Sequence, residues 1–218
     1  ISFTANPLNK TFAENYLKNE NITGVFAENV FNWDNYKYQL ITGMRLDEHD
    51  KFGFFFTPRT MFKVQATEKT IVRASVGTGW RTVNIFSENI NLLSSQRNII
   101  FTEQLKPEQA MNFGFNIVQS FETEKISGSI SADFYRTQFQ NQIFPDYDTD
   151  HTKAYISNFT GTSVSNGFQT DLNLIFYKVI TTKIAYNYLD VFKIADEKKN
   201  NLPFIPLNKI LTTFSYKP

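Results

Sequence analysis

The chain of 218 residues is rich in aromatic side chains, with 23 Phe and 10 Tyr against only 9 Gly and 7 Pro, which favours β-strands over disorder. Its formal net charge is +1 and charges of both signs are interspersed, so no basic stripe suggests binding to nucleic acid. Cysteine is absent, which excludes disulfides and thiolate metal sites. No apolar run approaches the roughly 18 residues of a transmembrane helix, whereas transmembrane β-strands stay compatible with the sequence.

Alternation of apolar and polar residues with a period of two predicts nine β-strands. Over residues 36–47, for example, Tyr38 and Leu40 fall on one face and Gln39 and Arg45 on the other. Each predicted strand has roughly 11 to 15 residues, whereas strands of soluble proteins cluster around 5 to 6. A tilted strand of about 12 residues is long enough to cross an apolar layer of about 25 Å. The predicted strands are residues 22–33, 36–47, 53–65, 70–81, 109–121, 125–138, 164–178, 180–192 and 207–217.

The predicted connections alternate between short and long. Short ones are residues 34–35, 66–69 and 122–124 and the junction at Val179; long ones are residues 82–108, 143–163 and 193–206. The connection at residues 48–52 is the exception, because it is short although the alternation predicts a long connection there. Aromatic residues gather beside the turns, as in the girdle of a membrane barrel: Phe31, Trp33, Tyr36, Tyr38, Phe176 and Tyr177. The sequence therefore predicts an all-β fold, an antiparallel up-and-down transmembrane β-barrel.

A glycine pair, Gly77 and Gly79, follows an apolar run and lies between Arg73 and Arg81, which raises the question of a phosphate-binding loop. A phosphate loop needs a third glycine or a Lys-Ser/Thr pair that opens a helix. Neither follows Gly79, and no helical period begins there. We therefore interpret the stretch as a strand that leads into a long loop.

Residues 146–151 resemble the start of a calcium-binding loop. However, His151 stands where such a loop needs Gly, and Ser157 stands where it needs Glu. We expect a solvated acidic loop, with a looser surface calcium site as the alternative. His49 and His151 lie in separate predicted loops without ligand spacing, and Ser165 stands where a nucleophile elbow needs glycine. The sequence predicts no enzyme activity, no metal site and no cofactor.

Several charged residues fall on the strand face opposite the apolar stripe. A charge that faces lipid at the middle of a bilayer costs about 2 to 4 kcal/mol, so these side chains are expected to point into the barrel. They are Lys37, Arg45, Arg59, Lys63, Arg73 and Asp133.

The order and spacing of successive segments resemble the TonB-dependent receptors of Gram-negative outer membranes. The resemblance runs almost from end to end, through GVFAENVFNWDNYKYQLITGMRLDEHDKFG, FTPRTMFKV, TIVRASVGTGWRT, LKPEQAMNFGFN, SADFYRTQFQNQI and LPFIPLNKILTTFSYKP. It includes a Gly-x-Arg-x-Asp strand end, at Gly43, Arg45 and Asp47, and a Thr-Pro-Arg strand from Thr57 to Arg59.

The resemblance implies a barrel of 22 strands with a plug domain inside, of which the nine strands here would be roughly strands 10 to 18. Residues 1–218 would then be a partial barrel domain, with the plug, the first strands and the last strands lying outside it. The implied partners are outer-membrane lipid, the protein's own plug domain, the TonB complex and a surface lipoprotein, with no nucleic acid. The polar strand faces would contact the plug.

The resemblance also implies active transport across the outer membrane of a Gram-negative bacterium. The solute would be a siderophore, cobalamin, a metal chelate or an oligosaccharide, and residues near the long loops would form an outer vestibule: Trp80, Arg81, Arg97 and Tyr155. Two other interpretations remain open, a passive or structural outer-membrane barrel and a soluble β-sandwich that acts as a carbohydrate-binding module.

Overall fold

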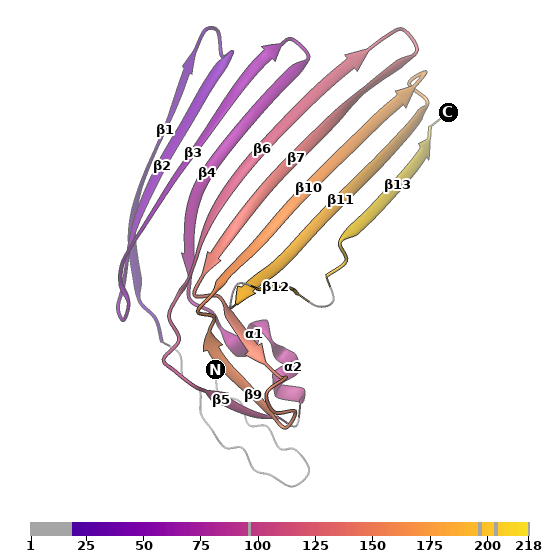
Figure 1. The fold of residues 1–218 in the computed structure, drawn as a ribbon. Coiled ribbons are helices and arrows are strands. Elements are labelled where there is room, and N and C mark those ends of the chain that lie inside the picture. Colours follow the sequence, from indigo (N-terminus) through magenta and orange to yellow (C-terminus); the bar gives the residue numbers. More distant parts are fainter. Residues whose placement is uncertain (1–18, 96, 196–197, 203–204, 218) are drawn as a thin grey trace.

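The protein is built around one long, curved antiparallel sheet, seen in a computed structural model that describes residues 19–95, 97–195, 198–202 and 205–217 (Figure 1). Within these residues the sheet has ten strands, in the order β1-β2-β3-β4-β6-β7-β10-β11-β12 with β13 also paired to β11. The long strands are β1 (Ile22–Trp33), β2 (Tyr38–His49), β3 (Gly53–Thr67), β4 (Thr70–Arg81), β6 (Glu108–Glu122), β7 (Ile126–Gln140), β10 (Thr162–Phe176), β11 (Ile180–Ala195) and β13 (Asn208–Tyr216). All nine predicted strands are confirmed, with ends that differ by at most three residues.

Short turns join the long strands at one end of the sheet, which we call the turn rim, and the long connections lie at the other end, the loop rim (Figure 1). Two of the turns place non-glycine residues in the left-handed region, with φ of 53° and 49° at Asp34 and Asn35 and of 49° and 60° at Tyr177 and Lys178. Such turns match the twist of the paired strands, and Asn and Asp tolerate them best.

The connections at the loop rim contain elements that the sequence analysis did not predict. We call residues 82–95, 97–107 and 141–161 together the loop unit; it lies below the main sheet in Figure 1. These elements have only four to six residues each, too few for a visible period. They are α1 (Ile85–Glu88), α2 (Ile90–Ser94) and a second sheet of β5 (Asn98–Phe101), β9 (Lys153–Asn158) and β8 (Ile143–Asp146), while β12 (Lys198–Asn201) pairs with β11.

The buried hydrophobic core of the described residues lies mainly in the loop unit. Ile85, Leu92, Ala154 and Ile156 pack together and are at most 5% exposed. The two long connections therefore fold into one small body, because α1 and α2 from the first cover strand β9 from the second.

The main sheet has one polar and one apolar face. On β7 the polar face carries Ser131 and Asp133, while Ile130 and Phe134 on the apolar face are 45% and 47% exposed. A β-sandwich would bury such a face under a second sheet. Within the described residues the second sheet belongs to the loop unit and the main sheet forms a single layer, so the sandwich alternative is wrong. The sheet is part of the wall of a transmembrane β-barrel, and its two outer strands, β1 and β13, are not paired with each other.

The hydrophobic part of the apolar face crosses the strands obliquely. On β7 it ends at Phe134, and Arg136 follows toward the loop rim. The register places Phe62 of β3 level with Phe134, yet on β3 this face carries two further aromatic residues nearer the loop rim, Phe56 and Phe54. An oblique border is what strands tilted across a bilayer require. In the described part of the chain neither helix is long and apolar enough to span a membrane.

We predict that Gly128→Ala weakens the sheet. A Cβ at position 128 would lie 2.2 Å from the backbone oxygen of Asn173 on β10, so the strands would have to move apart. The expected loss is about 1 to 3 kcal/mol of the free energy of unfolding. The check is a denaturant titration of the full-length protein in detergent, followed by the heat-dependent shift of barrels in gel electrophoresis.

The matched control is Gly79→Ala, because no heavy atom lies within 4 Å of a Cβ built there. Equal unfolding midpoints for the two variants would contradict the register of β7 and β10.

Candidate functional site: the polar face and the loop unit

A row of polar side chains crosses the polar face of the sheet at a single level. Arg73 Nη1 donates to Asn116 Oδ1 over 2.8 Å, and Asn116 Nδ2 donates to Asp133 Oδ1 over 2.7 Å. The row contains three cations and one carboxylate, so it attracts anionic groups. The strand register builds it from one residue of each neighbouring strand, and we call it the polar row: Gln39, Lys63, Arg73, Asn116, Asp133, Gln169, Asn187 and Lys209.

Three of the six residues predicted to point into the barrel, Lys63, Arg73 and Asp133, belong to the polar row. Arg45 and Arg59 lie on the same face, nearer the loop rim. The sixth residue, Lys37, lies instead in the turn before β2, where its Nζ is 3.8 Å from Asp34 Oδ2 and 5.4 Å from the centre of the Tyr38 ring.

Arg59 lies flat on the polar face because Gly43 leaves room for it. The two residues are opposite each other on β3 and β2, and Glu28 of β1 is the next residue along the same level. Arg59 Nη2 pairs with Glu28 Oε2, so its side chain crosses the whole of β2. A Cβ at position 43 would lie 2.9 Å from Arg59 Nε. The glycine thus keeps a charged side chain against the wall.

Asp47 is the centre of a group near the loop rim and is only 3% exposed. Arg45 Nε donates to its Oδ1 over 2.7 Å, and Trp80 Nε1 donates to its Oδ2 over 3.0 Å. The Trp80 ring also stacks on Phe55, with ring centres 4.0 Å apart. Trp80 therefore joins β4 to β2 and β3. The sequence predicted Trp80 as a residue of the vestibule and did not predict these contacts within the wall.

His49 is the last residue of β2, and its side chain is fully buried, whereas the sequence analysis placed it in a loop. Its Nε2 lies 3.5 Å from Glu20 Oε1, and its Nδ1 lies 2.9 Å from Asp50 Oδ1. The backbone N–H of Lys51 also points at Nδ1, at 3.0 Å. Thr82 Oγ1 donates to Glu20 Oε2 over 3.0 Å, so this group connects the chain just before β1 to the end of β4.

Glu108 attaches the loop unit to the barrel wall. It is 5% exposed and accepts a hydrogen bond of 2.7 Å from Arg81 Nε and one of 2.8 Å from the backbone N–H of Ile143. Arg81 Nη1 also lies 3.1 Å from Glu88 Oε2 of α1. Arg81, the second predicted vestibule residue, thus connects the wall to the first part of the loop unit, and Glu108 connects the wall to the second part.

The other two predicted vestibule residues, Arg97 and Tyr155, lie within the loop unit. Arg97 Nε donates to the backbone oxygen of His151 over 3.0 Å, and its guanidinium lies 4.9 Å from the centre of the Tyr147 ring. Burial raises the pKa of Tyr147, against the opposing charge of Arg97. Tyr155 is opposite Ile100 in the parallel pair of β9 and β5. The structure thus separates the four residues into a wall pair and a loop-unit pair.

In the acidic loop, the carboxylates of Asp146 and Asp150 accept hydrogen bonds from other residues of the same loop. Asp146 accepts from the hydroxyl of Thr149 over 2.6 Å and from the N–H of Asp148 over 2.8 Å, and these bonds lower its pKa. Hydrogen bonds from the hydroxyl and N–H of Thr152 lower the pKa of Asp150. Among the described residues no three His, Cys, Asp or Glu side chains are placed to hold a metal ion.

These contacts give the wall a hydrogen-bonded polar face and a folded body at its loop rim. Most of the connecting residues escaped the sequence analysis because they come from different strands and have no local motif. Glu108 and Asn116 are of this kind, whereas Asp47 was noted only as part of a Gly-x-Arg-x-Asp strand end and His49 only as a loop residue. A period-two pattern does assign Asn116 to the polar face, so the sequence alone could have identified that residue.

Comparisons with known proteins agree with this geometry. Residues 3–217 match a family model described as TonB dependent receptor-like, beta-barrel. A comparison with curated protein sequences gives no match.

Among solved structures, the siderophore receptor PirA from Acinetobacter baumannii aligns with a TM-score of 0.67 at 15% identity, over 91% of this chain and 31% of that one. A mutant of the ferric enterobactin receptor PfeA from Pseudomonas aeruginosa, in complex with enterobactin, gives 0.65 at 16% identity, over 90% and 30%. The pyoverdine receptor FpvA from the same organism, bound to pyoverdine, gives 0.63 at 13% identity, over 91% and 28%. The chain therefore spans less than a third of each of these proteins.

We predict that Glu108→Ala loosens the loop unit while the barrel stays folded. The variant removes the acceptor shared by Arg81 and Ile143, and hydrogen bonds to a charged group contribute about 1.5 to 3 kcal/mol each. Amide hydrogen exchange of residues 143–158 in the full-length protein should accelerate about ten-fold or more.

Glu122→Ala is the matched control, because Glu122 is the exposed last residue of the same strand at the turn rim. Unchanged exchange in the Glu108 variant would show that the loop unit does not depend on this connection.

Proposed function

Because the chain belongs to the TonB-dependent receptor β-barrel family, we propose that it forms part of the wall of an outer-membrane receptor for a large, scarce solute. The observation that carries this proposal is the polar row. A hydrogen-bonded row of mixed charge, on the face opposite the lipid, suits a wall that surrounds another protein surface better than one that lines a simple water channel.

The proposed partner inside the barrel is the protein's own plug domain. The polar row and the charged residues above it, Arg45 and Arg59, would contact the plug through hydrogen bonds and opposite charges. Three cations against one carboxylate in the polar row favour a plug surface that is acidic at this level. In this mechanism the TonB complex of the inner membrane pulls on the plug and opens a path along the polar face.

The loop unit is the proposed outer vestibule. Its core holds Arg97 and Tyr155 on a folded body, which positions binding groups more accurately than an irregular loop could. We retain both residues as candidate ligand contacts. Trp80 and Arg81 support the vestibule, because their side chains are engaged in wall contacts.

The solute class is a siderophore, cobalamin, another metal chelate or an oligosaccharide. Ferric siderophores come first for testing, since the similar solved structures are named as receptors for a siderophore, for ferric enterobactin and for pyoverdine. A surface lipoprotein would be an additional partner if the solute is an oligosaccharide. The proposed location is the outer membrane of a Gram-negative bacterium, and the proposed activity is transport without catalysis.

We predict that uptake through the full-length receptor needs the TonB complex. Cells that carry the receptor, intact or without the TonB complex, would be given ferric enterobactin, ferric pyoverdine or cobalamin with a radioactive metal. Accumulation of a solute should fall to the level of receptor-free cells when the TonB complex is deleted or the proton gradient is dissipated. Accumulation that persists without the TonB complex would support the alternative, a passive outer-membrane barrel.

A further inference from the structure

Strands β3 and β4 separate before they reach the loop rim. Their ladder ends at Arg59 opposite Gly77, although β3 begins at Gly53 and β4 continues to Arg81. The next residue of β3 is Pro58, which has no N–H to donate. The pairing of β3 with β2 and of β4 with β6 continues along the same stretch, so the break is confined to one pair of strands. We call this break the seam.

A cavity of about 550 Å³ lies at the seam and extends along the sheet as far as Gln138 and Gln140 of β7. That volume falls within the range of about 300 to 1,000 Å³ that is usual for small-molecule sites. Residues of both faces line it: Thr57, Gly79 and Ala110 belong to the polar face, and Phe54, Phe56, Thr78 and Met111 belong to the apolar face. Residues of both faces of the sheet therefore meet at this cavity.

Trp80 partly fills the seam. Its place opposite Gln109 assigns it to the apolar face of β4, yet its ring stacks on Phe55 and its Nε1 donates to Asp47, both on the polar face. The side chain reaches both because no ladder closes the space between β4 and β3.

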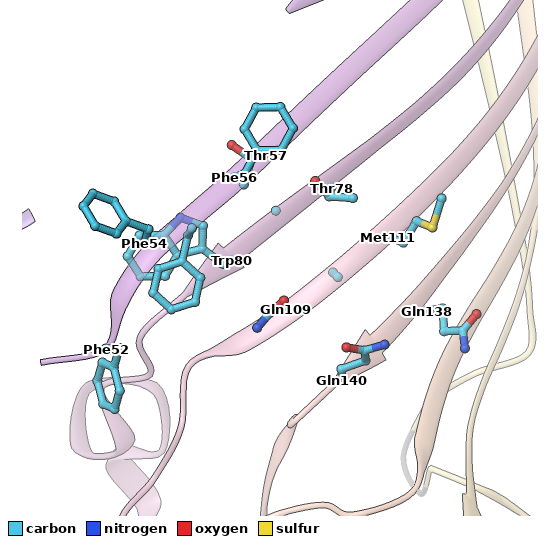
Figure 2. A pocket seen from close by; sticks show the side chains of 13 residues that line it. Phe52, Phe54, Phe56, Thr57, Thr78, Trp80, Gln109, Met111, Gln138 and Gln140 are labelled. Atoms are coloured by element: carbon cyan, nitrogen blue, oxygen red, sulfur yellow. The ribbon is translucent and has the colours of Figure 1, made fainter. Parts of the chain in front are cut away.

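The chemistry of the lining changes across the seam. Figure 2 shows the rings of Phe54, Phe56 and Trp80 on one side and the amides of Gln109, Gln138 and Gln140 along the other. Phe54 and Phe56 are 68% and 61% exposed. They lie on the apolar face of β3, beyond Pro58 and Thr60, so the seam opens onto the face that is directed to lipid.

Beside the glutamines the apolar face becomes charged. Gln138 is opposite Met111, and Arg136, two residues away on β7, is opposite Phe113. Arg136 Nη1 donates to Asn166 Oδ1 over 3.1 Å, and no other contact occupies its guanidinium within the described residues. A lipid is complementary to this arrangement, because its hydrocarbon chain adjoins hydrogen-bonding and anionic groups.

We propose that the seam binds a hydrocarbon chain of a lipid from the bilayer leaflet next to the loop rim, with the lipid headgroup on the glutamines and Arg136. The chain enters between Phe56 and Met111 and ends against Trp80. Continuity with the lipid-facing surface identifies the occupant, since any molecule that reaches the seam from that side comes from the bilayer.

Photo-crosslinking from within the seam tests this site. The full-length receptor, with p-benzoylphenylalanine at position 57, would be placed in nanodiscs of palmitoyl-oleoyl-phosphatidylglycerol. Illumination should attach lipid to the peptide that contains position 57, as detected by mass spectrometry. The same probe at Ser131, a polar-face position of β7 within a continuous ladder, should capture about ten-fold less. The probe at Phe134 on the apolar face is the positive control.

Trp80→Ala should raise lipid capture at position 57 several-fold, because it removes the side chain that partly fills the seam. Trp33→Ala, which removes the chain's other tryptophan at the turn rim, should leave capture unchanged. If the probe at position 57 prevents folding, Ala110 on the opposite side of the seam carries it instead. Capture of lipid at Phe134 but only of protein, or of nothing, at position 57 or 110 would overturn the proposal.

Discussion

Inside a bilayer every backbone N–H and C=O group must find a partner within the protein, and charged side chains must avoid the lipid. These two constraints account for most of this structure. The first requires long strands joined in an uninterrupted antiparallel ladder, as the pairing of β6 with both β4 and β7 shows. The second sorts side chains by alternation, so that Phe134 lies on the apolar face and its neighbour Asp133 on the polar face. The polar row results from both, because the ladder brings inward residues of successive strands to one level.

The same constraints explain why the long strands could be predicted. Alternation of apolar and polar residues is local, so the pattern from Ile126 onward predicts both the strand β7 and the residues on each of its faces. The exclusion of charge from lipid assigned Arg73 to the polar face of the strand, where its Nη1 donates to Asn116. The separation of Gly77 and Gly79 from any helix is also confirmed, since both lie within β4 and the first helix begins at Ile85.

What the sequence could not predict depends on pairs that are distant along the chain. Glu108 is an ordinary acidic residue until the fold brings it to Arg81 and to the backbone of Ile143. The loop unit has strands of four to six residues, too short for a period, and its core joins two separate connections. The seam begins at Pro58. The sequence shows this proline, but its effect on strand pairing can be predicted only when the strand next to β3 is known. The predicted contacts with the plug and the vestibule role of Arg97 and Tyr155 stay predictions.

The central claim is that the single sheet is a membrane wall with the polar row on its inner side. Spin labels at successive positions from 130 to 135 of β7 in the full-length receptor test it most directly, because oxygen dissolved in lipid reaches labels that face the bilayer and a water-soluble nickel complex does not. Residues 1–218 contain no cysteine that would compete for the label. We expect high oxygen accessibility at positions 130, 132 and 134 and low accessibility at 131, 133 and 135. Uniform accessibility, or the opposite alternation, would contradict the account.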